Sequence, residues 1–136
     1  MPSSREPVHP LEKRDLLHAE PPDVPRIDAI AAAMAASGRF PEAIDYIEIT
    51  KDAGLVARAE SDAVRRGSVW LLQQVERIRG TKCPPETWSR LADAAAATER
   101  HFDAVRALQA AGREADAETL RAEKCPDYEP FKPLGK

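Results

Sequence analysis

Residues 27–54 constrain the fold of this chain most, because they carry the pattern of two amphipathic helices joined by a tight corner. Four apolar side chains recur at the i, i+3, i+4, i+7 spacing that places them on one stripe of an α-helix. They are Ile27, Ile30, Ala31 and Met34. Gly38 follows, and glycine accepts the left-handed conformation that a helix C-cap requires. The pattern predicts a first helix that ends near residue 37.

A second helix is expected directly after this corner. Pro41 suits the first turn of a helix, and Glu42 suits its positively polarised start. A second apolar stripe follows at Ala43, Ile44 and Ile47. The two helices together predict a helical hairpin, in which small alanine side chains let the backbones approach closely.

The composition extends the helical prediction to the rest of the chain. The 136 residues are 43% hydrophobic and only 5% aromatic, alanine is abundant, and β-branched runs of period two are missing. Further helices are expected at 54–65, 69–79, 85–97, 102–111 and 113–123. Residues 1–25 hold six of the twelve prolines, so we expect an extended arm there with one helical turn at 11–18. A helical domain is expected over 26–124 and an extended tail over 125–136.

The corners recur along the sequence. Gly38, Gly67 and a third corner near Glu99 are spaced by about 30 residues, which is typical of stacked helix pairs. The third hairpin resembles the tetratricopeptide repeat at seven positions, which are Trp88, Leu91, Ala92, Ala95, Ala104, Leu108 and Ala111. The resulting prediction is an all-α fold, a short right-handed α-solenoid of about three helical hairpins with extended N- and C-terminal tails.

Residues 25–54 also resemble a more specific family, cytochrome c oxidase subunit Va, called subunit VI in fungi. Pro25 and Arg26 open a helix with Ile-Asp-Ala, and a Phe-x-x-Ala-Ile corner starts at Phe40. The second helix ends in Ile-Glu-Ile-x-Lys-Asp-Ala-Gly over residues 47–54, which resembles the family's ending Glu-Val-x-Lys-Asp-Lys-Ala-Gly. The resemblance implies a helical accessory subunit that holds no haem or copper. It would lie peripherally on the matrix side of the mitochondrial inner membrane, bound to other subunits of respiratory complex IV.

Charge and hydropathy exclude several classes of protein. The net charge of −3, with 32% charged residues, indicates a mixed, solvated surface without the basic face of a nucleic-acid binder. No apolar run approaches the ~20 residues of a membrane span. Residues 1–25 lack the apolar core of a secretory signal.

Residues that could carry chemistry are few. Cys83 and Cys125 both precede a proline, and three interpretations stay open: thiolate ligands of a Cys-Pro haem sensor, a disulfide, or two ordinary thiols. The three histidines show no metal-ligand spacing, and His101 occupies a corner position suited to packing. No phosphate loop or nucleophile signature is present. We therefore predict no catalytic, cofactor-binding or metal-binding residue, and a protein that is not an enzyme.

Partner-binding residues are predicted instead. Trp70 falls beside the apolar stripe of its helix, so we expect it to be partly exposed and to anchor a partner, whereas Trp88 belongs to the core. An acidic-edged groove is expected from the first helices of the hairpins, with candidates Asp28, Glu86, Arg90 and Asp93. Two functions remain: the accessory subunit described above, or a soluble, cytoplasmic tetratricopeptide-like adaptor that binds a peptide in this groove.

Overall fold

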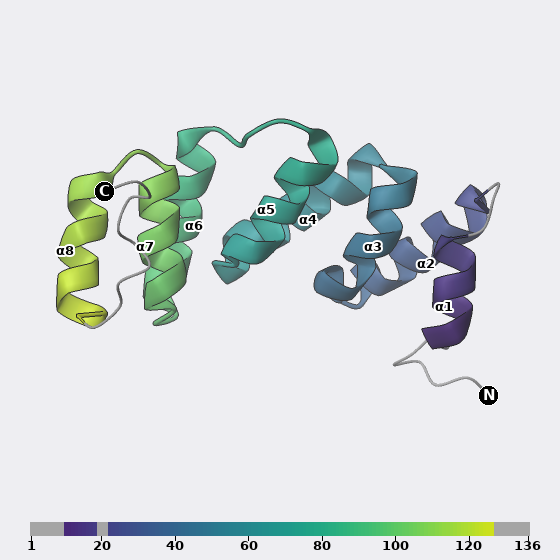
Figure 1. Cartoon of the computed structure of the whole chain (residues 1–136), viewed down its shortest axis with the longest axis horizontal. Coiled ribbons are helices and arrows are strands. Elements are labelled where there is room, and N and C mark those ends of the chain that lie inside the picture. The colour runs from purple at the N-terminus through teal and green to yellow at the C-terminus, as the bar shows by residue number, and fades with distance from the viewer. Residues whose placement is uncertain (1–9, 19–21, 127–136) are drawn as a thin grey trace. The chain divides into compact units, whose positions relative to one another are not determined.

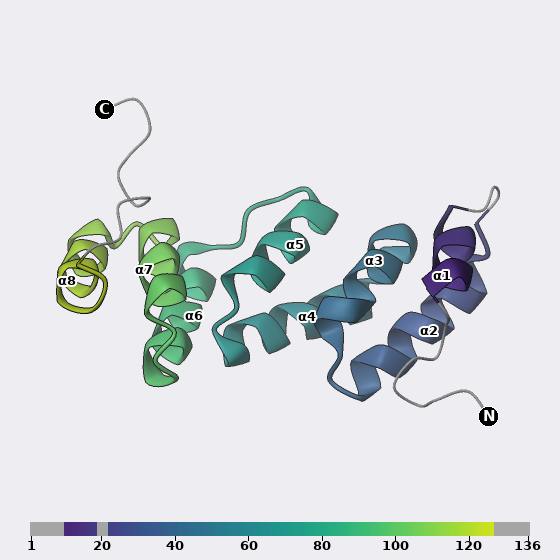
Figure 2. The same ribbon diagram turned by 60° about the horizontal axis from the view of Figure 1, so that its bottom comes forward.

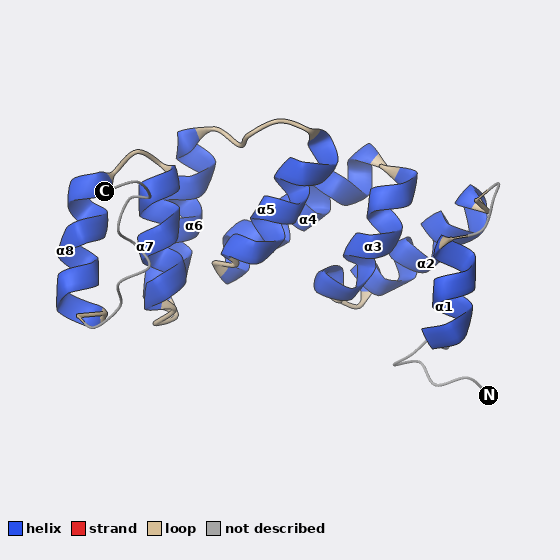
Figure 3. Cartoon of the chain, in the orientation of Figure 1, coloured by secondary structure: helices blue, strands red, loops and turns tan. Residues whose placement is uncertain are grey.

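The described residues, 10–18 and 22–126 of a computed structural model, form eight α-helices and no strand (Figure 3). The helices are α1 (Pro10–Leu17), α2 (Val24–Ala36), α3 (Phe40–Thr50), α4 (Ala53–Arg66), α5 (Val69–Arg79), α6 (Pro85–Ala97), α7 (His101–Ala110) and α8 (Glu114–Lys124) (Figure 1). The predicted all-α class is confirmed. Within the described part of the chain, no helix is long and apolar enough to cross a bilayer.

The chain divides into two compact units, Met1–Ala59 and Glu60–Lys136. Helix α4 contributes its first half to the first unit and its second half to the second unit. The expected helices after residue 26 all occur, with ends close to those predicted from glycine and proline. The expected arm 1–25 contains α1, which is longer than the single turn predicted at 11–18. Of the expected tail 125–136, only residues 125 and 126 are described.

The first unit is built on the hairpin of α2 and α3, which lie side by side in both views (Figures 1 and 2). Fully buried side chains fill the hairpin, among them Ile27, Ala31, Tyr46 and Ile47. Asp23 caps the start of α2, since its Oδ1 accepts a hydrogen bond from the Arg26 amide at 3.2 Å. Burial of these apolar stripes holds the two helices together, as the sequence periodicity predicts.

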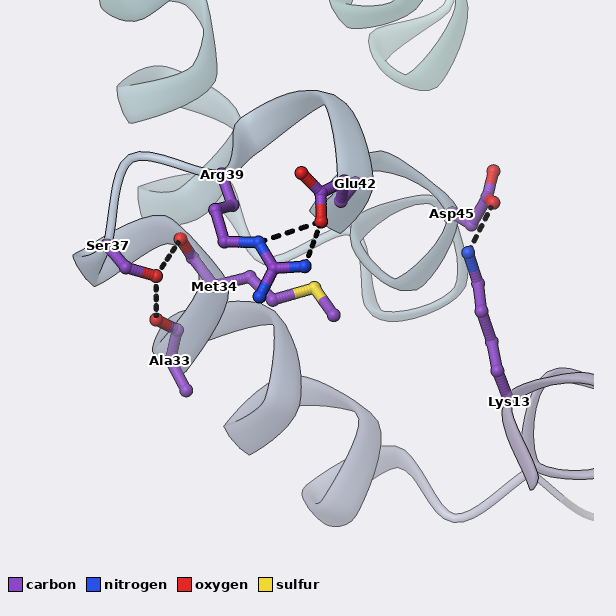
Figure 4. Close-up of polar contacts among 7 residues, drawn as sticks. All are labelled: Lys13, Ala33, Met34, Ser37, Arg39, Glu42 and Asp45. Carbon is purple, nitrogen blue, oxygen red and sulfur yellow. Dashed lines mark hydrogen bonds and ion pairs between the residues drawn. The ribbon is translucent and has the colours of Figure 1, made fainter. Parts of the chain in front are cut away.

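Helix α1 packs on α3 within the same unit. Lys13 Nζ lies 3.1 Å from Asp45 Oδ2 (Figure 4) and 5.2 Å from the centre of the Tyr46 ring. Leu16, on the same helix, is 8% exposed. A short helix with one buried leucine has a small apolar face, and the cation over the Tyr46 ring adds to it. The exposed ion pair contributes little.

The second unit contains α5–α8 and the end of α4. Helices α6, α7 and α8 lie side by side in both views (Figures 1 and 2). The largest fully buried side chains of this unit are Leu71, Leu72, Leu91, Val75 and Val105. The corner at Gly67 presses on α6, because a Cβ built on Gly67 would lie 2.6 Å from Ala95 Cα.

Four of the corners between helices share one hydrogen-bond pattern. A left-handed residue follows the helix at Gly38, Gly67, Glu99 and Gly112. At Gly38 the Arg39 amide donates to the Met34 carbonyl at 2.9 Å and the Gly38 amide donates to Ala35 at 3.0 Å, which is the Schellman motif. The same two bonds recur at the other three corners. The corner predicted near Glu99 is therefore confirmed.

An arginine and an acid complete three of these corners, a feature that the sequence analysis missed. Each arginine directly follows the left-handed residue and pairs with an acid three positions later: Arg39 with Glu42, Arg100 with Asp103, and Arg113 with Asp116 (Figure 4 shows the first). The acid lies in the first turn of the next helix, where the helix dipole also favours it. The fourth corner uses Ser68, whose Oγ accepts from the Leu71 amide at 3.3 Å.

Candidate partner-binding surface

Trp70 is exposed on α5 of the second unit. Its 49% exposure is high for a tryptophan, whose ring usually packs in a core. Gln73 and Arg77 follow at i+3 and i+7, so they lie on the same stripe of α5, and both are exposed. The Arg77 guanidinium donates to Gln74 Oε1 at 2.6 and 3.1 Å, which holds this part of the helix surface in place. The predicted exposure of Trp70 is confirmed, and its role in binding remains a prediction.

Two hollows adjoin this stripe within the second unit. One of about 470 Å³ lies between α5, the α5–α6 loop, α6 and α7. It is lined by Val69, Gln73, Glu76, Lys82, Cys83, Trp88, Arg106, Gln109 and Ala110. The other, of about 430 Å³, lies against α5 and the start of the loop, and shares Gln73, Glu76 and Lys82 with the first. We call the first hollow the α5–α7 pocket.

Glu76 lines the α5–α7 pocket and binds groups from the α5–α6 loop and from α6. Its side chain is 8% exposed, and its Oε2 accepts hydrogen bonds from the Cys83 amide at 2.7 Å and from Trp88 Nε1 at 3.1 Å. A buried carboxylate requires such donors, because hydrogen bonds replace the water that it has lost. One side chain therefore ties the α5–α6 loop and the start of α6 to α5. This contact fixes the loop that carries Lys82.

Cys83 is a buried thiol beside carboxylates. Its Sγ lies 3.7 Å from Glu60 Oε2, and Arg79 Nη1 pairs with the other oxygen of Glu60 at 3.0 Å. Burial, followed by the negative charges of Glu60 and Glu76, raises the pKa of the Cys83 thiol to about 11. The thiol is then protonated at neutral pH, and a protonated thiol is a poor nucleophile and metal ligand.

The cysteine alternatives can now be compared. Cys83 and Cys125 are both free and buried, so the disulfide is not formed in this structure. The raised pKa of Cys83 disfavours the thiolate that a haem-sensing site would need.

Trp88 is 5% exposed, which confirms its predicted place in the core. The residues described here contain no group of three histidine, cysteine or acidic side chains able to hold a metal ion.

The predicted candidates on α6 share one face. Glu86, Arg90 and Asp93 are all exposed and follow the i, i+4, i+7 spacing, so they form one solvated stripe. None of them lines the α5–α7 pocket. The structure thus brings these three together on α6 and keeps them on a different surface from Gln73, Glu76 and Lys82.

Asp28 lies in the first unit, beside Asp52. Its Oδ1 is buried without a hydrogen-bond partner, as is the Thr50 Oγ1. Desolvation and then the nearby Asp52 carboxylate raise the pKa of Asp28. Asp52 caps α4, since its Oδ1 accepts from the Leu55 amide at 3.1 Å.

The pocket residues Glu76, Lys82 and Arg106 were missed by the sequence analysis. Glu76 carried a usable signal, because it follows Val69 and Leu72 at i+7 and i+4 and therefore lies on the buried stripe of α5. Lys82 and Arg106 carried no such signal, because the sequence around an exposed cation does not show whether it lines a pocket. Only the packing of α5 and α7 brings them to one pocket.

Comparison with known proteins gives no relative from which a role could be transferred: the chain matches no protein-family model, no curated protein and no solved structure.

Proposed function

We propose that this protein is a non-catalytic interaction module that binds a protein partner through the exposed stripe of α5. The observation that carries the proposal is the 49% exposure of Trp70 on a helix that buries its apolar residues Val69, Leu71, Leu72 and Val75. Tryptophan is enriched at binding hot spots because one side chain buries a large area with little loss of conformational freedom. Gln73 and Arg77 on the same stripe supply polar contacts around it.

We further propose that the partner is another subunit of a larger assembly. The resemblance of residues 25–54 to cytochrome c oxidase subunit Va favours this reading, and those residues span the α2–α3 hairpin. In that case the chain is an accessory subunit on the matrix side of the mitochondrial inner membrane. The four similar corners support the further proposal of a right-handed solenoid of about three hairpins.

The alternative is a soluble tetratricopeptide-like adaptor in the cytoplasm. Its supporting observation is the stripe of Glu86, Arg90 and Asp93, whose charged heads all lie exposed along α6. In this reading α6 contributes to the groove of a peptide-binding module.

Native affinity capture of the tagged protein tests the proposal. The captured material is analysed by mass spectrometry, and its absorbance spectrum is recorded for haem. We expect wild-type protein to hold a stoichiometric partner and Trp70→Ala to lose it at least about tenfold, as for a hot-spot residue. Val24→Ala is the matched control, because Val24 is 42% exposed and belongs to the first unit.

The outcomes separate the readings. Oxidase subunits with haem a in the wild-type eluate support the accessory subunit, and a soluble partner without haem supports the adaptor. Equal retention by Trp70→Ala and wild type contradicts the α5 surface, provided that both proteins melt at the same temperature.

A further inference from the structure

We propose that the α5–α7 pocket binds a carboxylate side chain of an acidic segment in the partner, seated between Lys82 and Arg106. This inference rests on the proposed function and adds the chemistry of the partner. Lys82 comes from the α5–α6 loop and Arg106 from α7, and both line the same pocket of about 470 Å³. Gln73 on α5 connects the pocket to the stripe that begins at Trp70.

The two cations are available for a partner. Most arginines of the second unit are engaged within it: Arg65 and Arg66 with Asp62, Arg79 with Glu60, Arg100 with Asp103, Arg113 with Asp116 and Arg121 with Glu118. Lys82 and Arg106 are both exposed, and among the described residues neither has an ion-pair partner. The described part of a chain whose net charge is −3 thus places two cations without a described ion-pair partner in the lining of one pocket.

Glu76 also lines the pocket, and its Oε2 is already bound by the Cys83 amide and the Trp88 indole. These two N–H donors partly compensate the negative charge of the buried Glu76 carboxylate. The side-chain amides of Gln73 and Gln109 line the walls and can donate to an incoming carboxylate.

The surface therefore matches a partner segment that carries an apolar residue and an acidic residue close together. The apolar residue contacts Trp70, and the carboxylate enters the pocket beyond Gln73. The exposed cations contribute mainly selectivity and association rate, since exposed ion pairs are screened by salt. Binding should consequently weaken as the salt concentration rises.

An NMR titration of the full chain tests this. The probe is an acetylated, amidated peptide of alternating leucine and glutamate, and its matched control carries glutamine in place of every glutamate. We expect the glutamate peptide to shift the side-chain amides of Gln73 and Gln109 and the indole N–H of Trp88. We expect the glutamine peptide to bind at least about tenfold more weakly, because two charge contacts are lost.

Substitutions of the two cations test whether the α5–α7 pocket is responsible for binding the glutamate peptide. Lys82→Gln with Arg106→Gln should reduce affinity for the glutamate peptide by about tenfold, whereas Lys124→Gln, which removes an exposed cation of α8 outside the pocket, should not. Equal binding of both peptides, no shifts in the pocket, or equal effects of the two sets of variants would overturn the proposal. Inorganic phosphate that produces the same shifts at the same concentration would also overturn it, and would indicate a small-anion site.

Capture experiments distinguish this failure from failure of the proposed function. Loss of the native partner with Trp70→Ala but not with the Lys82 and Arg106 double variant keeps the α5 surface and rejects the acidic segment. Retention of the partner by both variants rejects both. Self-association of the wild type that the double variant abolishes assigns the pocket to a second copy of the chain and rejects an acidic segment in another protein.

Discussion

The two units each hold a poorly solvated carboxylate, Glu76 in the second and Asp28 in the first, and they do so in opposite ways. In the second unit, Glu76 is 8% exposed and receives two N–H donors, one from a loop and one from α6. In the first unit, Asp28 has one buried oxygen without a partner and faces a second carboxylate, Asp52. Glu76 therefore stabilises the packing around it, and ionised Asp28 costs free energy.

This difference indicates that the second unit requires a more specific packing arrangement than the first unit. The second unit combines the Glu76 contacts with the close approach of Gly67 to Ala95, and the same unit carries the exposed Trp70. A binding surface benefits from a rigid support, because ordering it on binding would reduce affinity. The first unit relies on the buried stripes of α2 and α3, which tolerate an unfavourable acidic pair at their edge.

The largest loss of stability is expected from a substitution at Gly67 in the second unit. Gly67→Ala should lower the free energy of unfolding by about 3 kcal/mol, since the added methyl group would meet the backbone of Ala95 in addition to the strain of a positive φ. Gly80→Ala is the matched control, because Gly80 also has a positive φ but no atom lies within 4 Å of the added Cβ. Its cost should be about 1 kcal/mol. Urea unfolding measures both, and equal losses would show that the approach to Ala95 is unimportant.

Glu76→Ala should come next. The change leaves the Cys83 amide and the Trp88 indole without their acceptor, so we expect a loss of about 2 kcal/mol of unfolding free energy. Glu86→Ala, at an exposed position of α6, should change stability by less than about 0.5 kcal/mol. Thermal unfolding followed by tryptophan fluorescence separates the two variants. If the Glu76→Ala protein is as stable as wild type, Glu76 does not stabilise the packing around it, and the contrast drawn with Asp28 is wrong.

Glu99→Gly should be mildly stabilising. Glu99 has a φ of 62°. The other three corners with the same two hydrogen bonds have glycine at this position. Relief of left-handed strain outweighs the extra flexibility of glycine in the unfolded chain by about 0.5 kcal/mol. A rise in the urea midpoint checks this, and a fall would indicate that the Glu99 side chain itself stabilises the corner.

Asp28→Asn should give the smallest effect, a pH-dependent stabilisation of the first unit. The folded-state pKa of Asp28 is raised above its ordinary value of 3.8, so the native state binds the proton more tightly than the unfolded state. Stability from this group is present at pH values below 3.8 and is lost as the pH rises through the raised folded-state pKa. The variant should therefore exceed wild type in melting temperature at pH 7 and match it at acidic pH. The opposite trend would mean that Asp28 is stabilised as an anion.

Local signals explain how far the sequence predicted the fold. Gly38 and Gly67 end helices and Pro85 starts one, because glycine without a Cβ accepts a positive φ and the proline ring fixes φ in the helical range. Even the Glu99 corner was located, since the repeat spacing substituted for a glycine. The expected proline-rich arm contains α1, whose support comes from Asp45 and Tyr46 of a distant helix.

The candidate site was less predictable, because its residues meet only through packing. Trp70 stood out by its place beside the apolar stripe. The α5–α7 pocket instead joins Lys82 to Arg106 across a loop and two helices, and no sequence spacing encodes that approach. Asp28, Glu86, Arg90 and Asp93 were grouped by analogy with a repeat groove, and of these the structure shows only the last three on a common stripe.

Hydrogen exchange measured by mass spectrometry tests the central claim most directly, because it compares the intact protein alone and in its native complex without any substitution. We expect the complex to protect amides of α5 and of the α5–α6 loop, residues 69–84, most strongly. Protection confined to α2 and α3, with unchanged exchange over residues 69–84, would contradict the assignment of the α5 surface as the site of partner binding.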